Sequence, residues 1–296
     1  MPPAARALAL TLAALAVGAA GCGGGGSTGQ TSGPLDSGSR VFVIVLENRE
    51  FNQVIGDPQA PYFNRLATRN ALANRFFAVS HPSLPNYLAM VGGSTFGIDS
   101  DCTRCKASGP NLGTQLSDAG IDWRAYMEGM PRSCFEGGYS GRYAKKHNPF
   151  YYFPQITSDP GLCARVVPGE QLAADLRGGG LPRFGWLTPD LCNDAHDCSF
   201  AVADRYLSRL VPRLRRHLGP DGYLVITFDE GETDAGCCGA EGGRIATVLL
   251  GPAIRRNARL ADPYTSYSLL ATLEDSFALP RLREASDTDP MSAAFR

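Results

Sequence analysis

The chain has 296 residues, of which 44% are hydrophobic and 19% are charged, and its formal net charge is −1. This composition is typical of a globular protein, and the length is sufficient for one large α/β domain. The charge provides no bulk electrostatic attraction to nucleic acid or to an anionic membrane, so we expect no nucleic-acid partner. An anionic substrate would need local positive charge, such as a bound metal ion.

Residues 1–22 are predicted to be a targeting segment rather than part of the fold. Arg6 provides a positive charge before the apolar run Ala7–Ala20, which is too short to span a bilayer. The segment ends in Ala-Ala-Gly-Cys, which resembles a bacterial lipobox with Cys22 as the lipidated first residue of the mature protein. Ordinary signal cleavage near this point is the alternative, and both interpretations predict export.

Residues 23–39 are rich in glycine and serine and predict a flexible tether. We expect the folded domain to occupy residues 40–296. The mature protein is then either secreted or anchored outside the cytoplasm through Cys22.

Nine cysteines are present, and setting Cys22 aside leaves an even number in an exported chain. We therefore expect disulfides. Cys237 and Cys238 are adjacent and either bond to each other or pair elsewhere. The spacing of the remaining cysteines makes three pairs plausible: Cys102–Cys105, Cys134–Cys163 and Cys192–Cys198.

An unbroken apolar run, Val41–Leu46, is followed at once by Glu47 and Asn48. Such a run is typical of a central parallel strand that is covered on both faces. Ligands of open α/β sheets bind beyond the carboxyl ends of the strands, so Glu47 and Asn48 are well placed to hold a metal ion. The alternative is the start of an ordinary polar loop.

A short helix is predicted over Pro61–Asn70, and a strand over Arg75–Val79 leads into Ser-His-Pro-Ser-Leu-Pro-Asn-Tyr. The two prolines of this motif restrict the backbone and so present Ser83 in a defined direction. We expect a helix over Leu84–Val91, whose N-terminus suits an anion such as phosphate. Ser83 is therefore the candidate nucleophile, and a proline-rich surface turn with a helix cap is the alternative.

Further along, Asn111–Ala119 predicts a helix and Ile121–Met127 a strand. Residues 130–168 are rich in glycine, proline and aromatic residues, which predicts a lid or pocket wall. This segment contains His147, which either binds a phosphate oxygen or is an ordinary loop histidine.

A short strand over Phe184–Leu187 precedes a loop that is crowded with polar groups. Hard cations and phosphate chemistry both favour carboxylate, amide and imidazole side chains. An amphipathic helix is predicted over Ala201–Leu218, and its arginines are most simply a solvated face. The polar groups of the loop are Asp190, Asn193, Asp194, His196 and Asp197.

A second buried strand, Tyr223–Phe228, also ends in acids, Asp229 and Glu230. A third apolar run covers Ile245–Leu250, and Thr265–Phe277 predicts a C-terminal helix. Strands that alternate with helices predict a single α/β domain with a mostly parallel central sheet flanked by helices.

If the first two apolar strands are parallel neighbours, oxygen atoms from Glu47-Asn48 and Asp229-Glu230 meet at one edge of the sheet. Like charges so close together are unfavourable unless a cation neutralises them, so we predict a divalent metal ion there. Such an ion lowers the pKa of a nearby Ser83 hydroxyl and polarises a phosphoryl oxygen. Three histidines lie in candidate site loops, where they can neutralise oxygens or protonate a leaving group: His81, His147 and His196.

Six motifs in this order resemble the phosphoesterase family that holds bacterial acid phosphatases and phospholipases C, within the alkaline-phosphatase-like superfamily. They span about residues 41–277, nearly the whole predicted domain. The motifs are Leu46-Glu47-Asn48-Arg49-Glu50-Phe51, His81-Pro82-Ser83-Leu84-Pro85-Asn86-Tyr87, His147-Asn148-Pro149-Phe150, Asn193-Asp194-Ala195-His196-Asp197, Phe228-Asp229-Glu230-Gly231 and Tyr264-Thr265-Ser266-Tyr267-Ser268-Leu269-Leu270.

The resemblance implies an alkaline-phosphatase-like fold and a phosphoric ester hydrolase. Attack by Ser83 would give a covalent phosphoserine that water later hydrolyses, and the three histidines above would surround the phosphate. The implied substrate is a small phosphorylated molecule or a phospholipid. The implied metal ligands are Glu47, Asn48, Asp229 and Glu230, and the candidate substrate-binding residues are Asn86, Asn193, Asp194 and Arg244.

Two positions depart from the family pattern. Ser266 stands where relatives often carry histidine, and Arg244 stands where some carry histidine; its guanidinium could replace that charge. Ser83 favours a phosphomonoesterase of the acid-phosphatase type, because phospholipase C-like members often carry threonine there. The alternatives are a phospholipase C-like phosphodiesterase and a catalytically silent surface lipoprotein that binds metal or phosphate.

Overall fold

The computed structural model of the chain describes Met1 and residues 35–296. The predicted targeting segment, its lipobox at Cys22 and most of the predicted tether lie outside the described residues. Within the described part, no helix combines the length and the apolar character that a membrane crossing requires.

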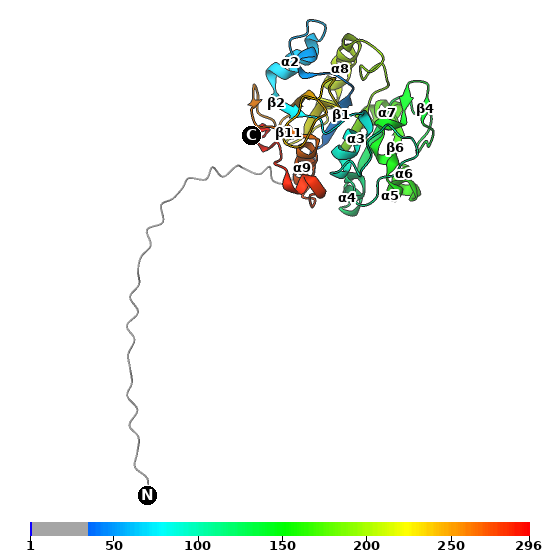
Figure 1. Cartoon of the computed structure of the whole chain (residues 1–296). Coiled ribbons are helices and arrows are strands. Elements are labelled where there is room, and N and C mark those ends of the chain that lie inside the picture. Colours follow the sequence, from blue (N-terminus) through cyan, green and yellow to red (C-terminus); the bar gives the residue numbers. More distant parts are fainter. Residues whose placement is uncertain (2–34) are drawn as a thin grey trace.

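A central sheet of nine strands organises the molecule (Figure 1). The strand order is β10-β2-β9-β8-β1-β7-β3-β6, with β11 also paired to β2. Every pairing is parallel except those of β9, which runs antiparallel to both β2 and β8. The prediction of an α/β domain with a mostly parallel sheet is thus confirmed. The strands are β1 Val41–Leu46, β2 Ala71–Phe77, β3 Trp123–Met127, β6 Val166–Pro168, β7 Phe184–Thr188, β8 Tyr223–Phe228, β9 Arg244–Leu250, β10 Arg259–Leu260 and β11 Tyr264–Thr265, and β4 Tyr139–Ser140 with β5 Tyr143–Ala144 forms a separate small ribbon.

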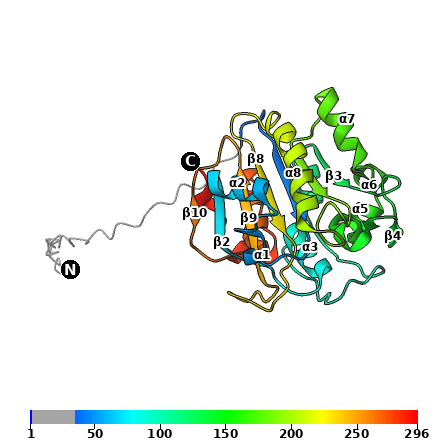
Figure 2. The ribbon, with the colours of Figure 1, turned by 90° about the horizontal axis from the view of Figure 1, so that it is seen from above.

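Helices cover both faces of the sheet. Helices α2 and α8 pack against each other on one face, while α3 packs against α9 and α4 on the other. Figure 2 shows α2 and α8 side by side across the strands. The α-helices are α1 Phe51–Val54, α2 Pro61–Arg69, α3 Ser83–Gly92, α4 Leu112–Asp118, α5 Pro154–Thr157, α6 Pro160–Cys163, α7 Glu170–Gly178, α8 Phe200–Arg215 and α9 Ser266–Ser276, and the 3-10 helices are η1 Lys145–His147, η2 Pro149–Tyr152, η3 Arg283–Asp287 and η4 Ser292–Ala294.

Strands β1 and β8 form the buried centre, and all their residues are buried. They are parallel neighbours, with Leu46 opposite Phe228 at their carboxyl ends. The apolar pattern, unbroken in β1 and interrupted in β8 only by Thr227, fits their position, because helices exclude water from both faces.

Strand β2 differs most from its predicted limits, whereas β3, β7 and β9 differ by one or two residues at one end. Strand β2 begins at Ala71, whereas the pattern indicated a start at Arg75. Its register against β9 shifts between Ala73 and Phe76, which marks a β-bulge. The extra residue interrupts the alternation of buried and exposed positions. The first half of the strand therefore lacks the two-residue period by which a strand is recognised in a sequence.

The structure contains four disulfides within the described residues. Three are the expected pairs Cys102–Cys105, Cys134–Cys163 and Cys192–Cys198. The fourth joins the adjacent Cys237 and Cys238, which settles the alternative that the sequence left open.

Candidate active site

The carboxyl ends of β1 and β8 bring two acidic segments together, as the sequence predicted. The backbone N–H of Asp229 donates to the carbonyl of Leu46 at 3.0 Å, and the N–H of Asn48 donates to Oδ1 of Asp229 at 3.2 Å. Glu47 and Asp229 are fully buried, and Glu230 is 5% exposed. The end of the Asn48 side chain lies 3.3 Å from both Glu47 Oε2 and Glu230 Oε1. The four residues predicted as metal ligands therefore lie together at the carboxyl ends of β1 and β8.

Ser83 is the first residue of α3 and is fully buried against this cluster. Its hydroxyl lies 3.1 Å from Glu230 Oε1 and 3.3 Å from Glu47 Oε2 and can donate to either. Tyr87 follows one helical turn later, and its hydroxyl donates to the other oxygen of Glu47. Residues four apart lie on the same face of a helix, so α3 delivers both hydroxyls to Glu47. We did not single out Tyr87 from the sequence, although its spacing from Ser83 was a usable signal.

The Asn86 side chain shapes the loop before Ser83 and does not face a substrate. Its Oδ1 accepts the N–H groups of Val79 and Ser80 at 2.7 and 3.0 Å, and its Nδ2 donates to the carbonyls of Ser80 and Pro82 at 2.6 and 3.3 Å. Because the amide oxygen and nitrogen are both committed to backbone, the substrate-binding assignment for Asn86 is replaced by a positioning one.

His147 and Asp194 also reach Glu47. His147 lies on η1, and its Nε2 is 3.2 Å from Glu47 Oε2, while its Nδ1 is 3.6 Å from Asp194 Oδ2. Ligand atoms of Glu47, His147 and Asp194 all lie within 4.8 Å of one another. Three buried polar atoms at this point have no hydrogen-bond partner among the described residues: His147 Nε2, Asp194 Oδ2 and Asp229 Oδ2.

Burial and mutual repulsion perturb the titration of this cluster. Burial, with the charges of Asp229 and Asp194, raises the pKa of Glu47 well above its usual range. Burial raises the pKa of Asp194 to about 8 and, together with the charge of Asp229, raises that of Glu230 to about 7. Burial also lowers the pKa of His147, so the neutral imidazole has a lone pair available.

These properties fit a hard divalent cation. Carboxylate and amide oxygens with one neutral imidazole form a donor set for such ions, and three buried donor atoms of this set have no hydrogen-bond partner among the described residues. A cation would remove the cost of burying several carboxylates together.

His81 and His196 lie at the rim of the cluster. The Nδ1 of His81 is paired with Glu230, and its Nε2 lies 3.2 Å from the carbonyl of Thr233. Burial alone would lower the pKa of His81, but the bond to Glu230 raises it overall. The His196 ring lies 5.8 Å from the His147 ring, and its Nδ1 is 2.7 Å from Asp197 Oδ1.

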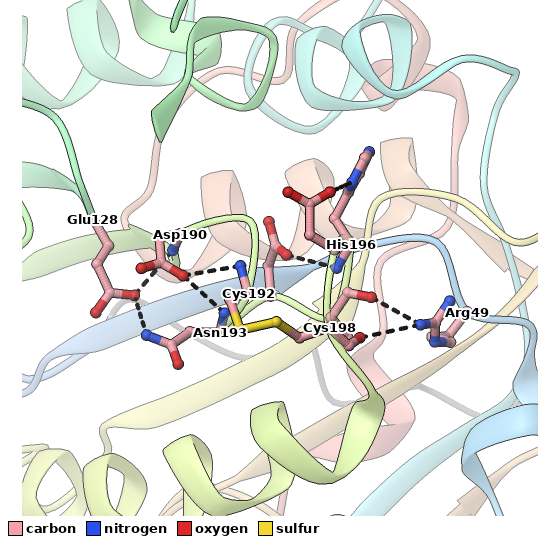
Figure 3. The surroundings of a disulfide bond; sticks show 10 residues. Arg49, Glu128, Asp190, Cys192, Asn193, His196 and Cys198 are labelled. Carbon is pink, nitrogen blue, oxygen red and sulfur yellow. Dashed lines mark hydrogen bonds and ion pairs between the residues drawn. A yellow bond between two sulfur atoms is a disulfide. The ribbon is translucent and has the colours of Figure 1, made fainter. Parts of the chain in front are cut away.

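The loop that carries Asp194 and His196 is closed by the Cys192–Cys198 disulfide and is held from two sides (Figure 3). On one side, Glu128 Oε2 accepts from the N–H of Asp190 and from Nδ2 of Asn193, at 2.9 and 3.0 Å. On the other, Arg49 donates to the carbonyls of Ala195 and Cys198, at 2.8 and 3.5 Å. Sequence reasoning assigned no role to Glu128 or Arg49, because their bonds to this loop join positions that are far apart in the chain.

Two predicted substrate-binding residues are therefore not brought to Ser83. Asn193 points toward Glu128, away from His196 (Figure 3). The Arg244 guanidinium donates to the carbonyl of Asn74 at 2.7 Å and lies 3.9 Å from the centre of the Phe51 ring. Among residues 35–296, neither side chain contacts Ser83 or its carboxylates.

Sequence reasoning did not single out two residues that lie near Ser83, Asp101 and Lys146. Lys146 Nζ lies 2.9 Å from Asp101 Oδ2, and Asp101 Oδ1 accepts the N–H of Leu84 at 3.0 Å.

Ser266, where relatives often carry histidine, is fully buried at the start of α9, and its hydroxyl has no partner within the described part of the chain.

Solved structures with a similar fold belong to proteins of distant sequence. A protein of the alkaline phosphatase superfamily from Vibrio parahaemolyticus aligns with a TM-score of 0.58 and 11% identity, covering 86% of this chain and 72% of that one. The lipoteichoic acid synthase LtaP from Listeria monocytogenes aligns with a TM-score of 0.60 and 11% identity, covering 87% and 76%. These likenesses establish the fold.

Two relatives are closer to this chain in sequence than these structures are. The chain is 31% identical over 268 residues to a phosphatidylinositol-3-phosphatase of Mycobacterium tuberculosis, covering 89% of this chain and 85% of the relative. It is 34% identical over 250 residues to a phosphate-repressible acid phosphatase of Penicillium chrysogenum, covering 81% of this chain but only 59% of that relative.

The model of the Phosphoesterase family matches residues 57–280. Ser83, His147 and Asp229 fall inside the matched stretch, whereas Glu47 and Asn48 precede it. The chain is thus a hydrolase of phosphoric ester bonds and belongs to the Phosphoesterase family.

Proposed function

We propose that this protein is an exported, metal-dependent phosphomonoesterase that acts through a phosphoserine intermediate. The observation that carries the proposal is the buried Ser83 hydroxyl, 3.1 Å from Glu230 Oε1 and 3.3 Å from Glu47 Oε2 at the start of a helix. The expected disulfides within the described residues support export. Anchoring through Cys22 remains part of the proposal.

Glu47, Asn48 and Asp229, with His147 and Asp194 beside Glu47, would hold the divalent ion. Glu230, which we predicted from the sequence as a further ligand, is assigned a different role here because its two oxygens face Ser83 and His81. When bound, the ion stabilises charge on the phosphoryl oxygens and favours the ionised serine. The N-terminus of α3 adds its partial positive charge at the same place.

In the first step, the Ser83 oxygen attacks phosphorus while its proton passes to Glu230, whose second oxygen is held by His81. The phosphorus–oxygen bond to the leaving alcohol breaks, and that oxygen takes a proton from His196, which Asp197 orients. In the second step, water gives a proton to His196 as its oxygen attacks phosphorus, the bond from phosphorus to Ser83 breaks, and the serine oxygen takes back its proton from Glu230.

The test is hydrolysis of p-nitrophenyl phosphate by the purified protein, with and without chelator. We expect chelator to abolish turnover and added divalent ion to restore it. Ser83→Ala should lower kcat by at least about 1,000-fold while the thermal unfolding curve is unchanged, because the covalent route is lost. Ser80→Ala is the matched control, since that hydroxyl donates only to the carbonyl of His81.

Turnover that survives in Ser83→Ala would refute the serine mechanism. If the wild type hydrolyses p-nitrophenyl phosphorylcholine but not p-nitrophenyl phosphate, the protein is a phospholipase C-like diesterase instead. If it takes up metal but hydrolyses neither ester, the silent binding-protein interpretation replaces both.

A further inference from the structure

A cleft of about 480 Å³ lies away from Ser83 and is lined by five arginines. Two of them, Arg65 and Arg69, project from α2, and Arg215 comes from the end of α8. Arg256 lies in the segment that follows β9, and Arg296, which comes after η4, is held there because its backbone N–H donates to the carbonyl of Ala253 at 3.0 Å. Helices α2 and α8 lie side by side at this position (Figure 2).

The cleft and the candidate active site are at opposite ends of the sheet. Strand β9 runs antiparallel to β8, so Leu250 at its end pairs with Leu224 near the start of β8. The cleft is lined by Gly251 and Pro252, directly after that point, whereas the acidic cluster follows the far end of β8. The length of a six-residue strand separates the two sites by about 20 Å.

The charged side chains that line the cleft are all arginines, and the Asp204 carboxylate, which accepts the N–H groups of Tyr62 and Phe63, does not line it. No aspartate or glutamate lines it, and none of the five arginines makes an ion pair within residues 35–296. Residues 2–34 contain no acidic side chain that could supply one. In a chain of net charge −1, five like charges around one concave surface repel each other unless an anion binds between them.

We propose that this arginine cleft, defined by Arg65, Arg69, Arg215, Arg256 and Arg296, is a binding site for a compound that carries several phosphate groups. Guanidinium groups bind phosphate oxygens in bidentate fashion, and a single phosphate group can bind only some of the five guanidinium groups. The ligand is therefore an oligophosphate in solution or a phosphorylated lipid headgroup. The site does not depend on the hydrolytic activity proposed for Ser83.

Some of the arginines are already oriented. The guanidinium of Arg65 lies 5.0 Å from the centre of the Tyr62 ring, and Arg296 Nε donates to the carbonyl of Ile254 at 3.0 Å. Both contacts leave the terminal nitrogens available to a ligand. Arg65, Arg69 and Arg256 are exposed, so they can be replaced without disturbing the core.

The test uses tripolyphosphate as the probe and isothermal titration calorimetry as the measurement, on protein that carries Ser83→Ala so that the probe is not hydrolysed. We expect binding that weakens steeply with salt. The triple variant Arg65→Gln/Arg69→Gln/Arg256→Gln should bind at least tenfold more weakly. The matched control, Arg104→Gln/Arg177→Gln/Arg205→Gln, removes three exposed arginines outside the cleft and should bind within twofold of the parent.

A second arm distinguishes the two sources of phosphate. Phosphatidylcholine vesicles with and without a phosphatidylinositol bisphosphate, whose headgroup carries several phosphates, are sedimented with the same proteins. Arginine-dependent binding to the acidic vesicles identifies a lipid headgroup, and its absence alongside tripolyphosphate binding identifies a soluble oligophosphate.

Equal loss of affinity in the control triple variant, or no loss in the cleft variant, would overturn the proposal. Hydrolysis of p-nitrophenyl phosphate by the cleft variant with Ser83 intact should stay within twofold of wild type. That readout separates the cleft from the proposed function, because either can fail while the other stands.

Discussion

Lys146 and Asp101 form an ion pair of 2.9 Å, and the same carboxylate accepts the N–H of Leu84, directly after Ser83. Burial alone would lower the pKa of Lys146, but the bond to Asp101 and nearby carboxylates raise it, so the ammonium keeps its charge. The pair thus places a fixed positive charge next to His147 and fixes the first turn of α3.

We predict that Lys146→Gln lowers kcat/KM for p-nitrophenyl phosphate by about 100-fold, because a fixed cation is lost from the site of negative charge. Asp101→Asn, which keeps an oxygen for Leu84, should cost about tenfold. The exposed Lys106→Gln is the control and should be unchanged. Equal rates for the Lys146 and Lys106 variants would exclude this role.

Arg49 joins the end of β1 to the loop that carries Asp194. Replacing it with Gln should weaken divalent-metal binding about tenfold, because residues that orient metal ligands typically matter to this extent. The affinity is measured by isothermal titration calorimetry, in which divalent metal is added to the metal-free protein. Glu232→Gln is the control, because it removes the 3.3 Å surface ion pair with Arg49 but leaves the bonds from Arg49 to the loop carbonyls. The metal affinity of this variant should stay at the wild-type value.

The Cys192–Cys198 disulfide closes the same loop. The double variant Cys192→Ser/Cys198→Ser should lose about 2 kcal/mol of unfolding free energy, as expected for a short closed loop. It should also lose phosphatase activity, since the position of Asp194 is less restricted. Urea denaturation and initial rates measure the two effects. Cys237→Ser/Cys238→Ser is the control, and an equal loss of activity there would contradict a specific role for the loop.

Asn86 should be important for stability. Asn86→Ala leaves four buried or partly buried backbone groups without their partner, so we expect a loss of about 3 kcal/mol in urea denaturation. Asn70→Ala removes a single bond to the carbonyl of Leu66 and should cost about 1 kcal/mol. Similar midpoints for the two variants would argue against the positioning role of Asn86.

Stability of the metal-free protein should fall as pH rises from about 4 to 8. Burial raises the folded-state pKa of Asp194 to about 8 and, with the charge of Asp229, that of Glu230 to about 7, from ordinary values near 4. The folded state therefore binds these protons more tightly than the unfolded state does, and that stabilisation is lost as they dissociate.

Bound divalent ion should reverse this trend, because it binds only the deprotonated ligands and competes with protons below pH 7. Melting temperatures across pH, with chelator and with metal, measure both effects. Glu274 is a buried acid outside the cluster, and burial raises its pKa to about 8. It contributes equally to the melting temperatures measured with chelator and with metal. A metal-induced rise in melting temperature that does not grow between pH 5 and pH 8 would refute the metal site.

The sequence alone predicted the α/β sheet, both central strands and the convergence of Glu47 with Asp229. This was possible because an unbroken apolar run indicates a buried parallel strand, and parallel strands end on the same side. The local pattern of Ser83 was equally informative, since proline restricts the backbone of its neighbours within a few residues.

Tertiary structure alone decided which polar side chains face the cluster and which face away. Asn86, Asn193 and Arg244 carry suitable groups, yet their hydrogen bonds go to the backbone or to Glu128. Asp101, Lys146 and the arginine cleft join residues that are distant in sequence, and no local periodicity encodes such pairings. Side-chain direction depends on long-range packing, and that information appears only when the whole chain has folded.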